Sequence, residues 1–511
     1  MKKHTKLALI LTASSVSFLS ACSSSSKYEP SGNPLLDLRN PELLERDRIS
    51  AAQAAWVEVE QGIRDRERTR YALKNLAWSG GTDPELRLVI LDLLMSDQSD
   101  AGSADSLTMA RLLLPNERDP EAVRIIARHA VDSGWKDLIP SFVRSLSKQN
   151  PSIPDRERAE FLAIERLSDG QPIEQVIFSV FLNPSGGSGS EQERAVLKVA
   201  DRTRDEAWGL LGRMDPSGQR RERFITSALQ NTESVDPGSV ELLKDIRSGR
   251  DELGVLPDTS LEISWLASLR HHTDERNRTA NEAWWSQARD AVRLLSNEQR
   301  ESLRLRHLEP VRWVSENESQ WLALSSEELY AVLNARLRDR TVHKRKSEGG
   351  EPPRLERLGD WVQQMSWGDL LTVLVVDEAL ASTAVRNQLF TQRGLDKQDS
   401  STEYGGVIET GPETQWRAVL YRPRQRDRLS DVRFVASDDM FRFSDRSLLH
   451  YHFHVNDRNN ARYAGPSLQD LQNSNYSQRT SMVLTSLGSD ELNVDVYFGN
   501  GVVIDLGKIQ R

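Results

Sequence analysis

The chain contains 511 residues, of which 38% are hydrophobic and 28% are charged, and it carries a formal net charge of −9. This balance is typical of a soluble, helix-rich globular protein, and the length predicts about two to four domains. The excess of acidic residues gives no indication of a nucleic-acid-binding surface, so we expect no nucleic-acid partner.

Residues 1–21 have the pattern of a secretory signal peptide. A basic start, which ends at Lys6, precedes an apolar run from Leu7 to Phe18 that is too short to span a membrane as a helix. Small residues then lead to Cys22, the single cysteine of the chain. No intramolecular disulfide is therefore expected.

The segment Leu19-Ser20-Ala21-Cys22 resembles the end of a bacterial lipoprotein signal. The resemblance implies cleavage before Cys22, lipid attachment to this residue, and a stable membrane anchor. Ser23, rather than Asp, after the cysteine implies an outer-membrane location that faces the periplasm. The alternative is a plain secretory signal in which Cys22 is incidental. Residues 22–45 are rich in Ser, Pro and Gly and are predicted to form a flexible tether.

Residues 46–235 contain a helix-start signal that recurs every 36 residues. Acidic residues suited to helix N-termini stand at this interval, each before an amphipathic run. One period holds two helices and two turns, so the pattern resembles a HEAT-like α-solenoid, in which each helix pair packs on the next. The resemblance implies a surface for protein or peptide partners and leaves the helical-repeat family open. The recurring positions are Asp47, Asp83, Asp119, Asp155 and Glu191.

Residues 236–345 keep a helical pattern and are predicted to extend the helical region. Their tryptophans occur at helical spacing, where aromatic residues more often form a core than a binding surface. The Gly- and Pro-containing segment 346–367 is predicted to be a linker to an α/β domain over residues 368–511. The tryptophans are Trp265, Trp284, Trp285, Trp313 and Trp321.

Three of the nine histidines, His450, His452 and His454, alternate with apolar residues. This spacing predicts a half-buried strand whose imidazoles share one face. Two of them could lean onto one ion, with Asp470 as the third ligand and a fourth position open, as in hydrolytic zinc sites. His450/His452 and His452/His454 are equally good pairs by spacing, and nearness to Asp470 favours the second. The alternative is that the histidines are merely solvated.

A second signal lies upstream, where Glu403 precedes Gly405 and Gly406 at the start of an apolar run. The glycines indicate a strand whose close packing excludes side chains. Residues 376–390 have a helical pattern, and a strand is expected before that helix. Further strands are predicted at 481–485, 492–498 and 502–506, the last two joined by a hairpin turn.

The order of strand, helix, Glu-x-Gly-Gly strand, His-x-His strand and Ser-x-x-Asp resembles the JAMM (MPN+) metalloprotease family over roughly residues 368–511. The resemblance implies a mixed α/β fold with His452, His454 and Asp470 as ligands of Zn²⁺. It also implies that Glu403 is the general base toward the attacking water and that Ser467 stabilises the oxyanion.

Two functions of different class follow from these signals. The first is a membrane-anchored zinc metallopeptidase, cutting peptide or isopeptide bonds, whose helical repeats present a protein or peptide substrate. The second is a non-catalytic lipoprotein scaffold that keeps a JAMM-like fold without turnover. Phe453, where the family usually has Ser or Thr, and the segment 455–466, which is longer than the usual spacer, motivate the second. We favour the hydrolase because the full set of motif residues is present.

Overall fold

The computed structural model describes residues 29–148, 150, 152–184, 199–343, 355–411, 415–428, 430, 433–456, 460–462 and 464–511. The predicted signal sequence 1–21, the lipid-attachment residue Cys22 and the repeat position Glu191 lie outside the described residues. Within those ranges, no helix combines the length and apolar character that a membrane crossing requires.

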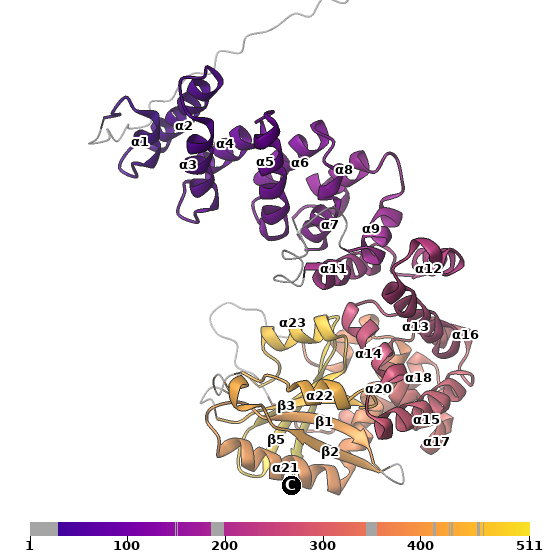
Figure 1. The fold of residues 1–511 in the computed structure, drawn as a ribbon. Helices are drawn as coiled ribbons and strands as arrows, with labels where there is room; N and C mark the ends of the chain where they lie inside the picture. Colours follow the sequence, from indigo (N-terminus) through magenta and orange to yellow (C-terminus); the bar gives the residue numbers. More distant parts are fainter. Residues whose placement is uncertain are drawn as a thin grey trace, which may run out of the picture. The chain divides into compact units, whose positions relative to one another are not determined.

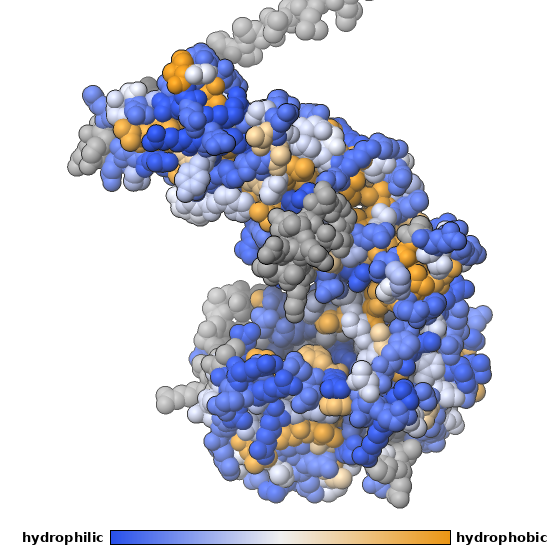
Figure 2. All heavy atoms as spheres, viewed as in Figure 1, coloured by the Kyte–Doolittle hydropathy of each residue, from blue (hydrophilic) through white to orange (hydrophobic). Residues whose placement is uncertain are grey.

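A mostly helical chain, with 63% of its residues in helices, ends in a six-stranded mixed sheet (Figure 1). The predicted order of a helical region followed by an α/β domain is therefore confirmed. The chain forms two compact units, Met1–Leu138 and Ile139–Arg511. The face drawn in Figure 2 is largely hydrophilic and carries small, separate apolar patches, as the share of charged residues leads one to expect.

The first unit is built from helices joined by short turns. Its first helix, α1 (Pro34–Arg39), begins after Asn33, whose side chain accepts a hydrogen bond from the Leu35 N–H, and its Leu38 is fully buried. The tether predicted over 22–45 therefore ends earlier than expected. The other helices are α2 (Glu45–Glu60), α3 (Arg66–Trp78), α4 (Pro84–Met95), α5 (Asp100–Leu113) and α6 (Pro120–Asp132).

The predicted periodic helix starts are only partly matched. Asp83 and Asp119 are the N-cap residues of α4 and α6, each followed by proline, and the Asp119 side chain accepts from the Glu121 N–H at 2.9 Å. Asp47 instead lies inside the first turn of α2, and Asp155 begins a short 3₁₀ helix. An acidic residue stabilises the whole first turn and not only the cap, so its spacing gives the helix start within a few residues.

Arginine–carboxylate pairs join successive helix pairs of the first unit. Arg48, on α2, pairs with Asp83 before α4. The buried Arg70, on α3, bonds Asp97 at 2.8 Å, which follows α4, and Asp105 at 2.8 Å, on α5. Such contacts between neighbouring pairs are what a stacked helical repeat requires.

The second unit begins with helices that pack on one another. Within it, α7 packs against α8 and α11, and α11 packs against α9. The helices before the α/β part are α7 (Ile139–Ser147), α8 (Ala159–Leu167), α9 (Ile173–Leu182), α11 (Val199–Met214), α12 (Gln219–Gln230), α13 (Pro237–Leu253), α14 (Ser260–His271), α15 (Glu275–Val292), α16 (Asn297–Glu301), α17 (Leu308–Asn317) and α18 (Ser326–Leu337).

The helices over residues 236–345 share one hydrophobic core with the sheet. This core runs from Leu253 to Leu506 and includes four of the five tryptophans singled out above, while Trp285 packs at its edge. The Trp265 indole N–H also donates to the Asp445 carbonyl oxygen at 2.8 Å. The structure therefore joins the predicted helical extension to the α/β part, because neither could bury its apolar face alone.

The sheet has the strand order β2-β1-β3-β4-β5-β6. Only the β3–β4 pairing is parallel among these six described strands, and the other neighbours are antiparallel. The strands predicted at the histidines, at the two glycines and near the C-terminus are all present. They are β1 (Gly405–Thr410), β2 (Trp416–Tyr421), β3 (Leu449–His454), β4 (Ser481–Ser486), β5 (Glu491–Tyr497) and β6 (Val503–Gln510).

The prediction of a strand before the helix at 376–390 is wrong. The residues before 376 already belong to a helix, α20 (Trp367–Ala381). Every residue from Trp367 to Asp377 is buried. A helix buried on all sides lacks a polar stripe, so its sequence resembles a buried strand. The predicted helix is also divided at Ser382, whose extended backbone ends α20 and precedes α21 (Thr383–Lys397). The remaining helices are α19 (Leu358–Trp361), α22 (Asp438–Phe443) and α23 (Leu468–Ser477).

Candidate metal centre

The register of two antiparallel strands brings Glu403 to the histidines. β1 and β3 pair so that Gly405 lies opposite His452. Continuing this register by two residues puts Glu403 opposite His454. Residues that face each other across an antiparallel pair lie on the same side of the sheet. The carboxylate and both imidazoles therefore share one face.

Asp470 comes from the crossover between the parallel strands β3 and β4. His454 is the last residue of β3, and α23 carries the chain back to the start of β4. Sites in α/β folds form where the carboxyl end of a parallel strand meets a helix N-terminus. Asp470 lies in the first turn of α23 and so reaches the end of β3.

The four side chains converge on a small volume. The Nε2 atoms of His452 and His454 are 3.2 Å apart. Asp470 Oδ1 lies 3.4 Å from His452 Nε2, and Asp470 Oδ2 lies 3.7 Å from His454 Nε2. Glu403 Oε1 lies 3.9 Å from His454 Nε2, and one ligand atom each from Glu403, His452 and His454 fit within 4.8 Å of one another.

These separations suit a tetrahedral zinc ion. With Zn–N and Zn–O bonds of about 2.0–2.1 Å, two ligand atoms of a tetrahedral site are about 3.3 Å apart. The contacts among His452, His454 and Asp470 range from 3.2 to 3.7 Å. Glu403 stands farther out, at 3.9 Å from the nearer imidazole. The two Asp470 contacts use different carboxylate oxygens, and Glu403 is the carboxylate whose ligand atom forms one compact group with both imidazoles. The distances therefore fit zinc held by two nitrogens and one carboxylate oxygen, which either Asp470 or Glu403 can supply.

The charges around the imidazoles favour a cation. Burial by itself lowers the pKa of His452, but the charge of Asp470 and the hydrogen bond that the imidazole donates to this carboxylate outweigh burial and raise this pKa. Burial likewise raises the pKa of Asp470, yet the neighbouring His452 and His454 hold it well below its usual range. Two carboxylates beside two imidazoles thus make a half-buried site that attracts positive charge.

His450 stands apart from this group although it shares the strand. Its Nε2 lies 3.0 Å from the Ser444 hydroxyl oxygen, and its ring packs against Phe441 at 6.0 Å between centroids. Burial and the nearby Arg479 lower its pKa well below the usual value. Among the described residues, the structure therefore groups His454, not His450, with His452 and Glu403, and Asp470 lies beside the same two imidazoles.

Ser467 holds Asp470 in place through a reciprocal pair of hydrogen bonds. The Ser467 hydroxyl accepts from the Asp470 N–H at 3.2 Å, and the Asp470 carboxylate accepts from the Ser467 N–H at 2.8 Å. This capping box starts α23. Because the Ser467 hydroxyl accepts in this bond, its own hydrogen can still be donated to another group.

One aromatic residue at the metal centre was not predicted from the sequence. Phe434 lies parallel to the His452 imidazole, with 5.5 Å between the ring centroids and 5° between the planes. It comes from the segment between β2 and α22, in which the described residues form one short 3₁₀ helix, Gln425–Asp427, that does not include Phe434. The only trace in the sequence is indirect, since Gly405 leaves room for the ring.

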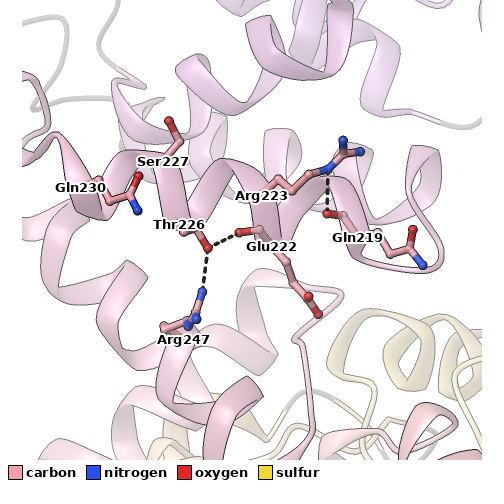
Figure 3. Close-up of a pocket in the computed structure, with 7 residues that line it drawn as sticks. All are labelled: Gln219, Glu222, Arg223, Thr226, Ser227, Gln230 and Arg247. Carbon is pink, nitrogen blue, oxygen red and sulfur yellow. Dashed lines mark hydrogen bonds between the residues drawn. The ribbon is translucent and has the colours of Figure 1, made fainter.

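The surface also has a depression that belongs to other elements. It has a volume of about 670 Å³ and is lined by residues of α12 and α13 (Figure 3). Two hydrogen bonds link its lining residues: Arg247 donates to the Thr226 hydroxyl at 2.6 Å, and that hydroxyl donates to the Glu222 carbonyl at 2.9 Å. None of its lining residues takes part in the metal centre.

Comparison with known proteins adds no identification: no family model, curated protein or solved structure matches the chain. The resemblance to JAMM metalloproteases therefore rests on this chain's own residues. Those residues are Glu403, His452, His454, Ser467 and Asp470.

Proposed function

We propose that the chain is a zinc-dependent hydrolase of the JAMM type that cleaves amide bonds in proteins or peptides. One observation carries the proposal. Two imidazoles and the carboxylate of Asp470, supplied by β3 and α23, converge at separations of 3.2–3.7 Å with a second carboxylate alongside. Histidines that are merely solvated on a strand surface would not be expected to converge with the buried Glu403 and the half-buried Asp470.

The residues divide the chemistry among them. Zinc, held by His452, His454 and Asp470, would supply Lewis acidity, which acidifies water and polarises a carbonyl. Glu403 accepts the proton of the attacking water and passes it to the leaving amine as the C–N bond breaks. The Ser467 hydroxyl donates to the carbonyl oxygen as negative charge develops there.

The rest of the chain would bring this site to its substrate. We propose that Cys22 carries a lipid anchor at the outer membrane, facing the periplasm, and that the helix pairs form a HEAT-like surface for a protein partner. The Asp83 and Asp119 helix starts and the arginine pairs between neighbouring helices support a repeat. The anchor rests on the sequence alone.

Metal content separates this proposal from the non-catalytic scaffold. We expect one equivalent of zinc in the full chain purified without chelator, and its loss in His454→Ala and Asp470→Ala. Glu403→Gln should keep the zinc and lose peptide hydrolysis, because it removes the base but no ligand. His450→Ala is the matched control on the same strand and should keep the zinc. A wild type without zinc would favour the scaffold.

A further inference from the structure

We infer that Phe434 is a positioning residue that fixes the plane of the His452 imidazole at the metal centre. The two rings are nearly parallel, with 5° between their planes and 5.5 Å between their centroids. This is the offset stacked arrangement that aromatic pairs prefer. The inference rests on the proposed function, since His452 is a ligand only if the site binds metal.

The absence of a side chain at Gly405 makes room for the Phe434 ring next to β1. Gly405 pairs with His452 across β1 and β3. A Cβ at Gly405 would lie 2.5 Å from Phe434 Cζ and 2.5 Å from the Tyr451 carbonyl oxygen. The ring therefore occupies the space that a side chain on β1 would fill, and glycine is required here for close packing.

The stack restricts the one rotation that matters for a histidine ligand. The second side-chain torsion of histidine has a broad energy profile, so the ring plane is poorly defined without neighbours. Phe434 packs flat on one side of the ring, while Nε2 points toward His454 and Asp470 at 3.2 and 3.4 Å. Removing a group that orients a metal ligand by a hydrogen bond typically weakens metal affinity, and we expect the loss of a stacked ring that fixes the ligand plane to have a similar effect.

The test is a titration of the metal-free full chain with Zn²⁺ against a chromophoric chelator, repeated with Co²⁺, whose visible absorption reports ligand geometry. Phe434→Ala should weaken zinc affinity by about 10-fold to 100-fold and change the cobalt spectrum. Phe434→Tyr keeps a flat ring and should therefore retain the zinc affinity and the cobalt spectrum of the wild type. Phe434→Leu keeps apolar bulk without the plane and should behave like Phe434→Ala.

The outcomes separate this inference from the proposed function. If wild type binds zinc and Phe434→Leu binds it equally well with the same cobalt spectrum, Phe434 only fills space and the inference is overturned. If wild type binds neither metal, the proposed function fails and this inference falls with it. A circular dichroism melt of each variant identifies any that lose the fold, and the comparison of Phe434→Leu with Phe434→Tyr still decides the point if Phe434→Ala does not fold.

Discussion

Ser467 and Asp470 cap the first turn of α23 for each other, with N–H to oxygen contacts of 3.2 and 2.8 Å. The same two residues belong to the candidate metal centre, because Asp470 Oδ1 lies 3.4 Å from His452 Nε2. The capping box that starts α23 therefore also orients the Asp470 carboxylate toward the imidazoles of β3.

Ser467→Ala should therefore reduce stability and metal binding together. Loss of the cap costs about 1 kcal/mol in unfolding experiments, and a freer Asp470 should weaken zinc affinity. The matched control is Ser325→Ala in α18, where Ser325 and Glu328 form the same box at 3.2 and 2.8 Å. The control should lose similar stability and bind zinc as wild type does. If both variants bound zinc with the same affinity, the cap at Ser467 would not contribute to the metal centre.

Gly406 should tolerate no side chain. A Cβ there would lie 2.0 Å from the Val419 carbonyl oxygen, on the neighbouring strand β2. Gly406→Ala should lower the free energy of unfolding by about 1–3 kcal/mol or more, because backbone must move. Gly209→Ala is the control: Gly209 lies inside α11 with nothing within 4 Å of the added atom. It should stabilise the chain by about 0.5–1 kcal/mol. Urea unfolding of both variants measures the difference.

The buried His307 should make stability depend on pH. Its Nδ1 accepts from the Arg304 N–H at 3.0 Å, so Nε2 carries the proton and donates to Asp369 Oδ1 at 3.0 Å. Burial lowers the pKa of His307 to about 4. Between pH 6.5 and 4, His307 is therefore protonated in the unfolded chain but neutral in the folded chain. Stability should fall by about 3 kcal/mol from this residue as the pH drops from 6.5 to 4.

The comparison that isolates this effect is His307→Gln, measured by chemical denaturation at several pH values. The variant should lose the part of the slope between pH 6.5 and 4 that His307 causes. Arg306 and His307 hold the pKa of Asp369 well below its usual range, so the contribution of Asp369 is lost only below about pH 4. Parallel curves for wild type and variant between pH 4 and 6.5 would contradict the assignment.

Arg479 should be essential to the joint between α14 and the sheet. Its guanidinium lies 3.9 Å from the Trp265 ring centroid, donates to the Ser444 carbonyl at 3.1 Å, and pairs with the buried Asp445 at 3.4 Å. Arg479→Met leaves Asp445 buried without this partner and should destabilise by about 3–5 kcal/mol.

Two further variants check that result by urea unfolding followed through tryptophan fluorescence. Arg479→Met combined with Asp445→Asn should recover part of the loss, because the unpaired charge is gone. Arg278→Met, which breaks an exposed pair with Glu275 on α15, should change stability by less than about 1 kcal/mol. A loss in Arg479→Met no larger than in Arg278→Met would show that the joint does not depend on Arg479.

The sequence by itself determined the local parts of the candidate site. The alternation around His452 and His454 predicted a strand because side chains on a strand change face at every residue. The Gly405-Gly406 pair predicted a closely packed strand, and Asp83 and Asp119 marked helix starts. Each of these signals depends only on residues that are close together in the sequence, so it can be recognised without knowing the fold.

Only the tertiary structure decided which of these parts meet. Glu403 reaches His454 through the register of β1 on β3, and Asp470 reaches His452 through the crossover helix α23. The choice between a strand and a buried helix for the stretch before residue 376 likewise depended on the segments that pack around it. So did the stacking of Phe434 on His452. Register and burial are set by apolar contacts between segments far apart in the chain, and no local pattern contains that information.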